Sequence, residues 1–248
     1  MRRLSIIMIT LLAGWVLPAS AQNVYWIPAA AHLSGFGSSV WRTDLALINL
    51  EARAATVELR LHRESGIAGE TFVIDPGQQQ IFQDAVALLT LEDASGSIEV
   101  RSTERLTVRS RTYNAAVDGS FGQALDGITS LTGIELNEGA RLVQLSEDGS
   151  FRSNIGAVNM GETAATIKVD LYEASGAFIG SFDLDLPAGQ LRQDGRPYKK
   201  RFQRTDIVGG FAEIQLTEGD HVYVYGSVID NETGDPTTIS MERMAACN

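Results

Sequence analysis

Residues 41–66, WRTDLALINLEARAATVELRLHRESG, align without a gap with residues 151–176, FRSNIGAVNMGETAATIKVDLYEASG, at a shift of 110 positions. Most of the aligned pairs are identical or exchange similar side chains. The identical pairs include Arg42 and Arg152, Asn49 and Asn159, Leu61 and Leu171, and the triplet Ala-Ala-Thr at 54–56 and 164–166. A period of this length is too long for a solenoid unit and matches one small domain. The self-similarity therefore predicts two homologous domains in tandem.

Apolar and polar residues alternate with a period of two inside each copy, as in residues 57–62 (VELRLH) and 167–172 (IKVDLY). Such alternation indicates strands with one buried face, which is typical of antiparallel sheets. Turn signals such as Ser65-Gly66 separate the runs, and residues 84–91 predict one short helix with Asp84 as its capping residue. Seven or so short strands in each copy is the size of an immunoglobulin-like sandwich. The predicted fold is all-β, with two tandem homologous immunoglobulin-like β-sandwich domains.

A further pattern of strand and turn residues recurs in the two copies. In the second copy it comprises Val158-Asn159-Met160-Gly161, Val169-Asp170-Leu171-Tyr172, Ser175-Gly176 and Pro187-Ala188-Gly189-Gln190. In the first copy it comprises Asn49, Ala55, Leu59, Leu61, Gly66 and Pro76-Gly77-Gln78. With these residues each copy resembles an immunoglobulin-like module of bacterial secreted proteins, of the CARDB kind. The resemblance covers about a third of each copy. It implies the sandwich fold and does not identify a ligand.

The N-terminus has the pattern of a Sec-type signal peptide. Arg2 and Arg3 precede an apolar stretch over residues 4–17, and Ala19-Ser20-Ala21 supplies a cleavage site. The apolar stretch is too short to span a bilayer comfortably. We therefore predict a signal peptide over residues 1–21, a first module over 22–132 and a second module over 133–248. The mature chain is expected to be secreted or periplasmic, with no integral membrane segment.

Composition excludes several classes of protein. With 44% apolar residues and a single cysteine, the chain is neither disordered nor a disulfide scaffold. A formal net charge of −11 and a pI near 4.7 argue against a nucleic-acid partner, because phosphate contacts need clustered cations.

Catalytic motifs are missing from the sequence. His32, His62 and His221 are isolated from one another and from other metal ligands, and no nucleophile elbow or phosphate-binding glycine loop occurs. We therefore expect no metal, no cofactor and no catalysis. The favoured function is a secreted binding or scaffolding protein, in an adhesion-like, extracellular-matrix or accessory role, with an extracellular polysaccharide or a protein as partner. A hydrolase of extracellular polymers and a periplasmic assembly subunit stay open as alternatives.

The first candidate site is a row of aromatic residues, His221, Tyr223 and Tyr225, on a predicted strand. Residues 105–109 are the corresponding strand of the first copy, so the tyrosines replace polar residues on its outward face. Exposed tyrosines can stack on sugar rings or anchor a partner. The alternative is that this face packs on the first module or under a loop.

The second candidate site is a basic stretch between residues 192 and 204. It could bind an anionic polysaccharide, a lipid head group or an acidic patch of another copy, or it could be a solvated loop. Its cations are Arg192, Arg196, Lys199, Lys200, Arg201 and Arg204.

Two further segments of the sequence are distinctive. Residues 230–235 are rich in oxygen donors, but a polar hairpin turn is favoured over a calcium loop. The motif Trp41-Arg42-Thr43-Asp44 lies outside the generic module pattern, and the sequence attaches no function to it.

Overall fold

The computed structural model describes residues 22–35, 39–116 and 119–244, so the predicted signal peptide lies outside the described residues. We call residues 22–126 the first half and residues 127–244 the second half. The strands of the first half are β1 (Asn23–Ser34), β2 (Val40–Asn49), β3 (Ala55–Arg63), β4 (Gly66–Ile74), β5 (Gln79–Phe82), β6 (Ala94–Ser102), β7 (Leu106–Ala116) and β8 (Gly119–Asp126). Those of the second half are β9 (Gly139–Glu147), β10 (Phe151–Asn159), β11 (Ala165–Tyr172), β12 (Phe178–Leu186), β13 (Leu191–Gly195), β14 (Ile207–Glu218), β15 (Val222–Asp230), β16 (Pro236–Ser240) and β17 (Glu242–Met244).

All strand pairings are antiparallel, and the two halves have the same strand order. In the first half the orders are β4-β3-β6-β1 and β5-β2-β7-β8, with the end of β1 also pairing with β2 through Leu33 and Trp41. In the second half they are β12-β11-β14-β9 and β13-β10-β15-β16, with β17 added beside β9. The prediction of an all-β, sandwich-like chain is confirmed. No helix among the described residues is long and apolar enough to cross a bilayer.

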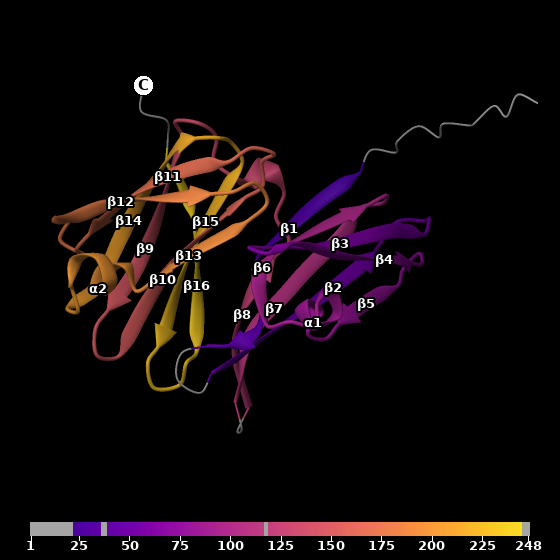
Figure 1. The fold of residues 1–248 in the computed structure, drawn as a ribbon, viewed down its shortest axis with the longest axis horizontal. Coiled ribbons are helices and arrows are strands. Elements are labelled where there is room, and N and C mark those ends of the chain that lie inside the picture. The colour runs from indigo at the N-terminus through magenta and orange to yellow at the C-terminus, as the bar shows by residue number, and fades with distance from the viewer. Residues whose placement is uncertain (1–21, 36–38, 117–118, 245–248) are drawn as a thin grey trace, which may run out of the picture.

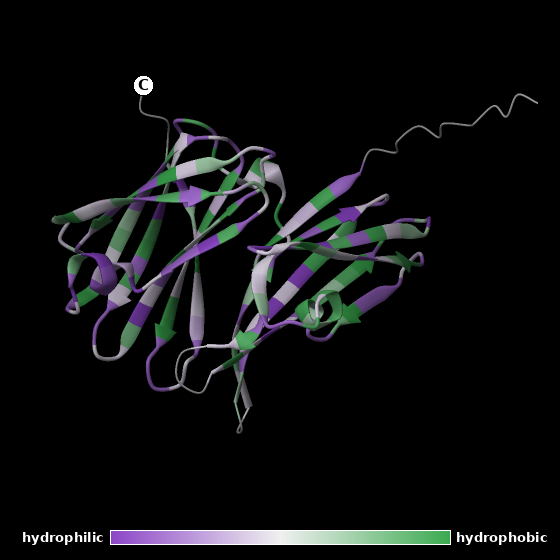
Figure 2. Ribbon diagram, viewed as in Figure 1, coloured by the Kyte–Doolittle hydropathy of each residue, from purple (hydrophilic) through white to green (hydrophobic). Residues whose placement is uncertain are grey.

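Each half has its own apolar core between its two sheets. The alternating residues point inward as expected: Val57, Leu59 and Leu61 are fully buried in one core, and Val169 and Leu171 in the other. Figure 2 shows the resulting bands of hydrophobic and hydrophilic residues along the strands. Burying one face of each strand supplies most of the driving force for folding.

Asn49 and Asn159 make the same hydrogen bonds in the two halves. The Asn49 side-chain amide donates to the carbonyl oxygens of Arg53 and Ile74, at 2.8 and 3.0 Å. The Asn159 amide donates to the corresponding carbonyls of Thr163 and Leu186, at 2.7 and 2.9 Å. Both asparagines are fully buried, so each holds a strand end and a turn together from inside.

Two short helices interrupt the strands, α1 (Ala85–Leu89) and α2 (Pro197–Phe202). The structure confirms the first of them but not its predicted cap. Asp84 stands at the N-cap position in a left-handed conformation and makes no side-chain capping bond. Its carboxylate instead pairs with His32 and Arg42. Helix α2 was not predicted and occupies the basic stretch, which Figure 2 shows as hydrophilic.

The two halves lie side by side and share a third apolar cluster (Figure 1). The first half contributes Trp26, Ala29 and Leu125, and the second half contributes Val158, Met160, Tyr223 and Tyr225. Polar contacts surround this cluster, among them a 2.5 Å hydrogen bond from the Ser97 hydroxyl to the Gly189 carbonyl oxygen. The halves are therefore packed against each other rather than joined only by a linker.

Candidate binding cleft between the two halves

A cavity of about 470 Å³ lies between the halves and is lined by residues of both. We call it the cleft. Its first-half wall comes mainly from β1, β2, β7 and β8, and its second-half wall from β10, β13 and β15. This volume suits a small ligand, and junctions between domains are common binding sites. The lining residues that matter for its chemistry are Trp41, Gln123, Arg152, Gln193, Arg196 and Tyr225.

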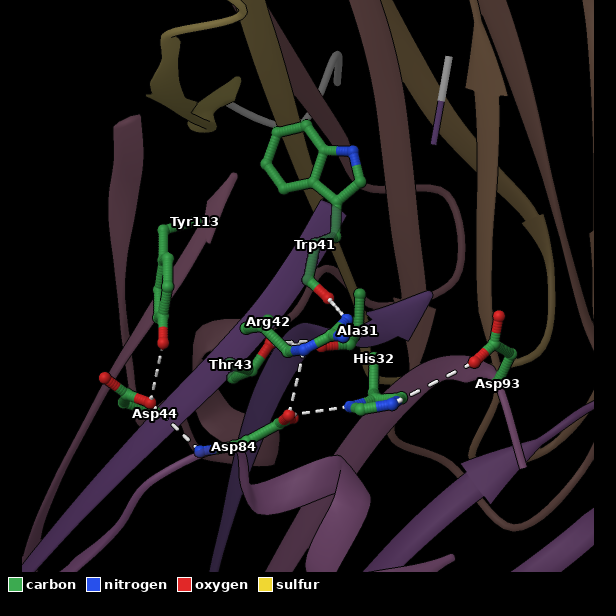
Figure 3. Close-up of polar contacts among 9 residues, drawn as sticks. All are labelled: Ala31, His32, Trp41, Arg42, Thr43, Asp44, Asp84, Asp93 and Tyr113. Atoms are coloured by element: carbon green, nitrogen blue, oxygen red, sulfur yellow. Dashed lines mark hydrogen bonds and ion pairs between the residues drawn. The ribbon is translucent and has the colours of Figure 1, made fainter. Parts of the chain in front are cut away.

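Strand β2 brings the motif of residues 41–44 to the cleft and alternates its side chains between two sides. Asp44 points to one side, where it accepts a 3.0 Å hydrogen bond from the backbone N–H of Asp84. The Trp41 indole extends away from the carboxylates of Asp44 and Asp84, as Figure 3 shows, and lines the cleft. The motif to which the sequence attached no function thus supplies an aromatic wall.

A polar cluster fixes the position of β2 behind Trp41. The Asp84 carboxylate lies 2.6 Å from His32 Nδ1 and 3.1 Å from Arg42 Nε (Figure 3). These three side chains come from β1, β2 and the start of α1, so the cluster ties two strands to the helix. Because His32 and Asp84 are half-buried, the hydrogen bond between them is stronger than it would be at the surface.

The second half builds the same cluster with different residues. Asp84 and Arg196 both precede a short helix in a left-handed conformation, with φ of 50° and 57°. Arg196 Nη2 lies 2.6 Å from the carboxylate of Glu147, which is fully buried. Burial and the nearby Arg196 charge lower the pKa of Arg152, whereas the charge of Glu147 acts in the opposite direction. Arg152 therefore takes the place of Arg42. The acidic residue stands before the helix in the first half (Asp84) and on the strand in the second half (Glu147).

Hydroxyl groups confirm that His32 and Glu147 are equivalent. The Thr43 hydroxyl bonds to the backbone N–H and carbonyl oxygen of Ala31, the residue before His32. The Ser153 hydroxyl bonds to the same groups of Ser146, the residue before Glu147. Because one half builds its cluster without a histidine, the role common to the two clusters is to join strand and helix, not to transfer protons.

Amide groups supply hydrogen-bond donors to the cleft. The Gln123 side-chain oxygen accepts from the hydroxyls of Ser227 and Thr238, at 3.1 and 2.9 Å. The Gln193 oxygen accepts from the Tyr225 hydroxyl at 2.9 Å. Neither amide nitrogen has a hydrogen-bond partner among the described residues. Since a glutamine amide has two N–H donors, both residues can donate to a ligand.

The structure corrects the predicted aromatic site. The rings of Tyr223 and Tyr225 are not exposed, because 8% and 0% of their surface remains accessible under Trp26 and Leu125 of the first half. Burial accordingly raises the pKa of both hydroxyls. His221 is separate from them and lies 2.6 Å from Glu135. The expectation of an exposed stacking face is wrong, and the alternative, packing against the first module, holds.

The structure also corrects the predicted basic loop. Residues 197–202 of this stretch form α2, and five of the six cations pair with carboxylates of the same chain. Lys200 and Arg201 both pair with Asp194, which is buried. The other pairs are Arg192 with Glu64, Arg196 with Glu147, and Arg204 with Glu173 and Asp206. Among the described residues no ion pair involves Lys199. The six residues therefore do not form one free anion-binding surface, and of them Arg196 lines the cleft.

A buried hydrogen-bonded pair, His62 and Glu99, lies at the edge of the interface. His62 Nε2 lies 2.9 Å from the Glu99 carboxylate, and the His62 ring packs on Trp26 with a centroid distance of 5.0 Å. Gly189, in a turn of the second half, lies directly over this ring. A Cβ there would come within 2.2 Å of His62 Nδ1, and the φ of 73° also favours glycine. The close approach of the two halves thus depends on this turn.

The pH dependence of stability should reveal the Glu99 pair. Burial raises the pKa of Glu99, but hydrogen bonds from His62 and Arg101 lower it by more, so the net pKa lies below the ordinary 4.5. A carboxyl group whose pKa is lower in the folded state stabilises that state at pH values above its pKa in the unfolded chain. This contribution is lost as the pH falls below about 4.5. We expect Glu99→Gln to cost about 1–3 kcal/mol of unfolding free energy at pH 7. The difference from wild type should narrow in urea unfolding at pH 3; a constant difference would contradict the assignment.

The oxygen-rich turn at residues 230–235 is held by its own backbone. The Asp230 carboxylate accepts hydrogen bonds from the N–H groups of Glu232 and Thr233, both at 2.8 Å. These bonds, the Thr233 one foremost, lower the pKa of Asp230 despite its partial desolvation. This geometry is that of a polar hairpin turn.

Sequence reasoning missed Gln123, Gln193 and Asn154 as residues of the cleft. They come from three different strands; Gln193 lies inside the basic stretch and Asn154 inside the repeat, but neither pattern gives the amide a role. The signals that the sequence did carry for this cleft are Trp41, Arg196 and Tyr225, which belong to three separate patterns.

No protein-family model matches the chain, and no curated protein sequence is significantly similar to it. A β-glucuronidase from Bacteroides uniformis aligns at 13% identity over 82% of this chain and 24% of its own, with a TM-score of 0.18. A glycosyl hydrolase family 2 member from Bacteroides cellulosilyticus aligns at 6% identity over 90% and 28%, also with a TM-score of 0.18. The chain spans about a quarter of the length of these enzymes. Similarity at this level establishes no shared fold.

Proposed function

We propose that the protein is a secreted, non-catalytic binding protein that holds a saccharide segment of an extracellular polymer in the cleft. In this proposal the chain consists of a signal peptide and two homologous immunoglobulin-like β-sandwich modules, residues 22–132 and 133–248. The repeated strand order and the repeated ionic cluster support the two modules. The observation that carries the binding function is a cleft whose walls come from both halves, with Trp41 and the amide of Gln123 on the first-half wall and the amide of Gln193 on the second-half wall.

The side chains of the cleft suit recognition of a sugar. An aromatic ring packs on the apolar face of a pyranose, and amide groups hydrogen-bond to its hydroxyls. Hydrolysis of a glycosidic bond would require two carboxyl groups flanking the bond. Among the described residues that line the cleft there is no aspartate or glutamate. This favours binding over the hydrolase alternative.

Titration of the mature protein with oligosaccharides tests this function. Isothermal calorimetry should detect binding, and Trp41→Ala should weaken it at least tenfold, or about 1.4 kcal/mol. Phe178→Ala is the matched control, since Phe178 is an exposed aromatic residue on β12 outside the cleft. Binding that survives the loss of Trp41, or the release of shortened sugars, would contradict the proposal.

A further inference from the structure

Both arginines that line the cleft already have partners within the second half. Arg196 Nη2 and Nε lie 2.6 and 2.8 Å from the carboxylate of Glu147, which is fully buried and does not line the cleft. Arg152 Nη1 donates a 2.9 Å hydrogen bond to the side-chain oxygen of Asn231. Burial and the Arg196 charge lower the pKa of Arg152, whereas the charges of Glu147 and Asp230 raise it. The two guanidinium groups therefore have two carboxylates of their own half as counter-charges.

The other polar groups of the cleft are uncharged. They are side-chain amides and hydroxyls, and among the described residues no aspartate, glutamate, lysine or histidine lines the cleft. The oxygens of Gln123, on the first-half wall, and Gln193, on the second-half wall, accept hydroxyl hydrogens and leave the amide N–H groups for a ligand. Trp41, Leu33 and Leu191 add apolar surface. These groups match a ligand that has hydroxyls and apolar faces.

A charged ligand would lose its hydration in this cleft without gaining an unpaired counter-charge. Burying an ionised carboxylate without a partner is costly, and to pair with Arg196 it would have to compete with Glu147. The formal net charge of −11 adds repulsion toward anions. A cationic ligand would instead meet two guanidinium groups in a wall that has no carboxylate among its described residues.

We infer that the cleft selects an uncharged saccharide, and that Glu147 determines this selectivity by neutralising the arginines from beneath the wall. This inference rests on the proposed function and specifies its ligand class. Glu147 acts through Arg196, since it is buried and does not line the cleft. The corresponding cluster of the first half, built on Asp84 and His32, contributes neither of these side chains to the cleft.

The test compares two neutral disaccharides, galactobiose and cellobiose, with their acidic counterparts, digalacturonate and cellobiouronate. Isothermal calorimetry on the mature protein gives the four affinities. In a pair that binds, we expect the neutral sugar to bind at least tenfold more tightly than the uronate, because the carboxylate is desolvated without an unpaired counter-charge.

Glu147→Gln keeps the shape of the side chain and removes its charge, so that Arg196 becomes available to a carboxylate of the ligand. The ratio of uronate affinity to neutral affinity should rise at least tenfold over that of the wild type. Glu173→Gln is the matched control. It removes a carboxylate that pairs with Arg204, away from the cleft, and changes the net charge of the chain by the same amount. Its ratio should equal that of the wild type.

Gln193→Lys serves as a second variant in case Glu147→Gln does not fold. It adds a cation at an exposed position of the wall, with Glu147 intact, and should raise the same ratio. A wild type that binds a uronate as tightly as its neutral counterpart would overturn the inference and leave saccharide binding standing. An unchanged ratio in folded Glu147→Gln, or in Gln193→Lys, would do the same. Binding of none of the four sugars would overturn the proposed function as well.

Discussion

Replacing Tyr225 by alanine is expected to lower the free energy of unfolding by about 3–5 kcal/mol, the range for removing a large buried aromatic side chain. The ring is fully buried and lies over Gly156, where a Cβ would come within 2.3 Å of it. It also packs in the apolar cluster between the halves, and its hydroxyl donates to Gln193. Alanine would leave a cavity at the junction, and the side-chain oxygen of Gln193 would lose its hydrogen-bond donor.

Arg109→Ala provides a control at the corresponding position of the first half. Register places Leu106 opposite Asn49 and Val222 opposite Asn159, so Arg109 is the counterpart of Tyr225. Arg109 is exposed, and its loss should change stability by less than about 0.5 kcal/mol. Urea unfolding of the mature chain measures both values. A loss below 1 kcal/mol for Tyr225→Ala would show that the halves do not pack as described.

Replacing Glu147 by alanine is expected to cost about 3–5 kcal/mol, because it leaves Arg196 and Arg152 near a buried site without their carboxylate. The first half suggests how to rescue this loss. There the strand position is His32 and the helix position is Asp84. Glu147→His combined with Arg196→Asp should therefore recover much of the stability that each single change removes.

A double-mutant cycle measures this rescue. Coupling between the two positions should be at least 1–2 kcal/mol, since contacting charged residues are far from additive. The left-handed conformation at residue 196 is no obstacle, because aspartate adopts it at residue 84. Additive single effects would mean that the two clusters are not equivalent.

The sequence was sufficient for the strands because their pattern reflects burial alone. Residues 57–62 and 167–172 alternate, and the structure places both in strands with one buried face. The identity of Asn49 and Asn159 likewise marked two positions with the same hydrogen bonds. Local periodicity and a long repeat carry this information without any knowledge of how the halves meet.

The cleft could not be predicted because it depends on contacts between the copies. The repeat showed that Tyr223 and Tyr225 had replaced Thr107 and Arg109 on an outward face, but not what covers that face. Charge in residues 192–204 was visible, as was Asp194 within this stretch, whereas the partners Glu147 and Glu173 lie far away in the sequence. Such pairings depend on the tertiary arrangement.

Differences between the two halves also determine whether the contact between them can repeat. If each half carried both of the complementary surfaces, one molecule could dock on the next and form an open filament. One of the two surfaces here is formed by Trp26 beside Glu99 on the first half. At the same register positions the second half has Arg141, which is exposed, paired with Glu213.

The other surface is confined to the second half in the same way. Tyr223 and Tyr225 form it, and the first half presents the exposed Thr107 and Arg109 in their place. Each copy thus keeps one mating surface and has a charged or polar version of the other. The surfaces of the two halves therefore satisfy each other, and the same contact cannot repeat head to tail between further halves of these two kinds.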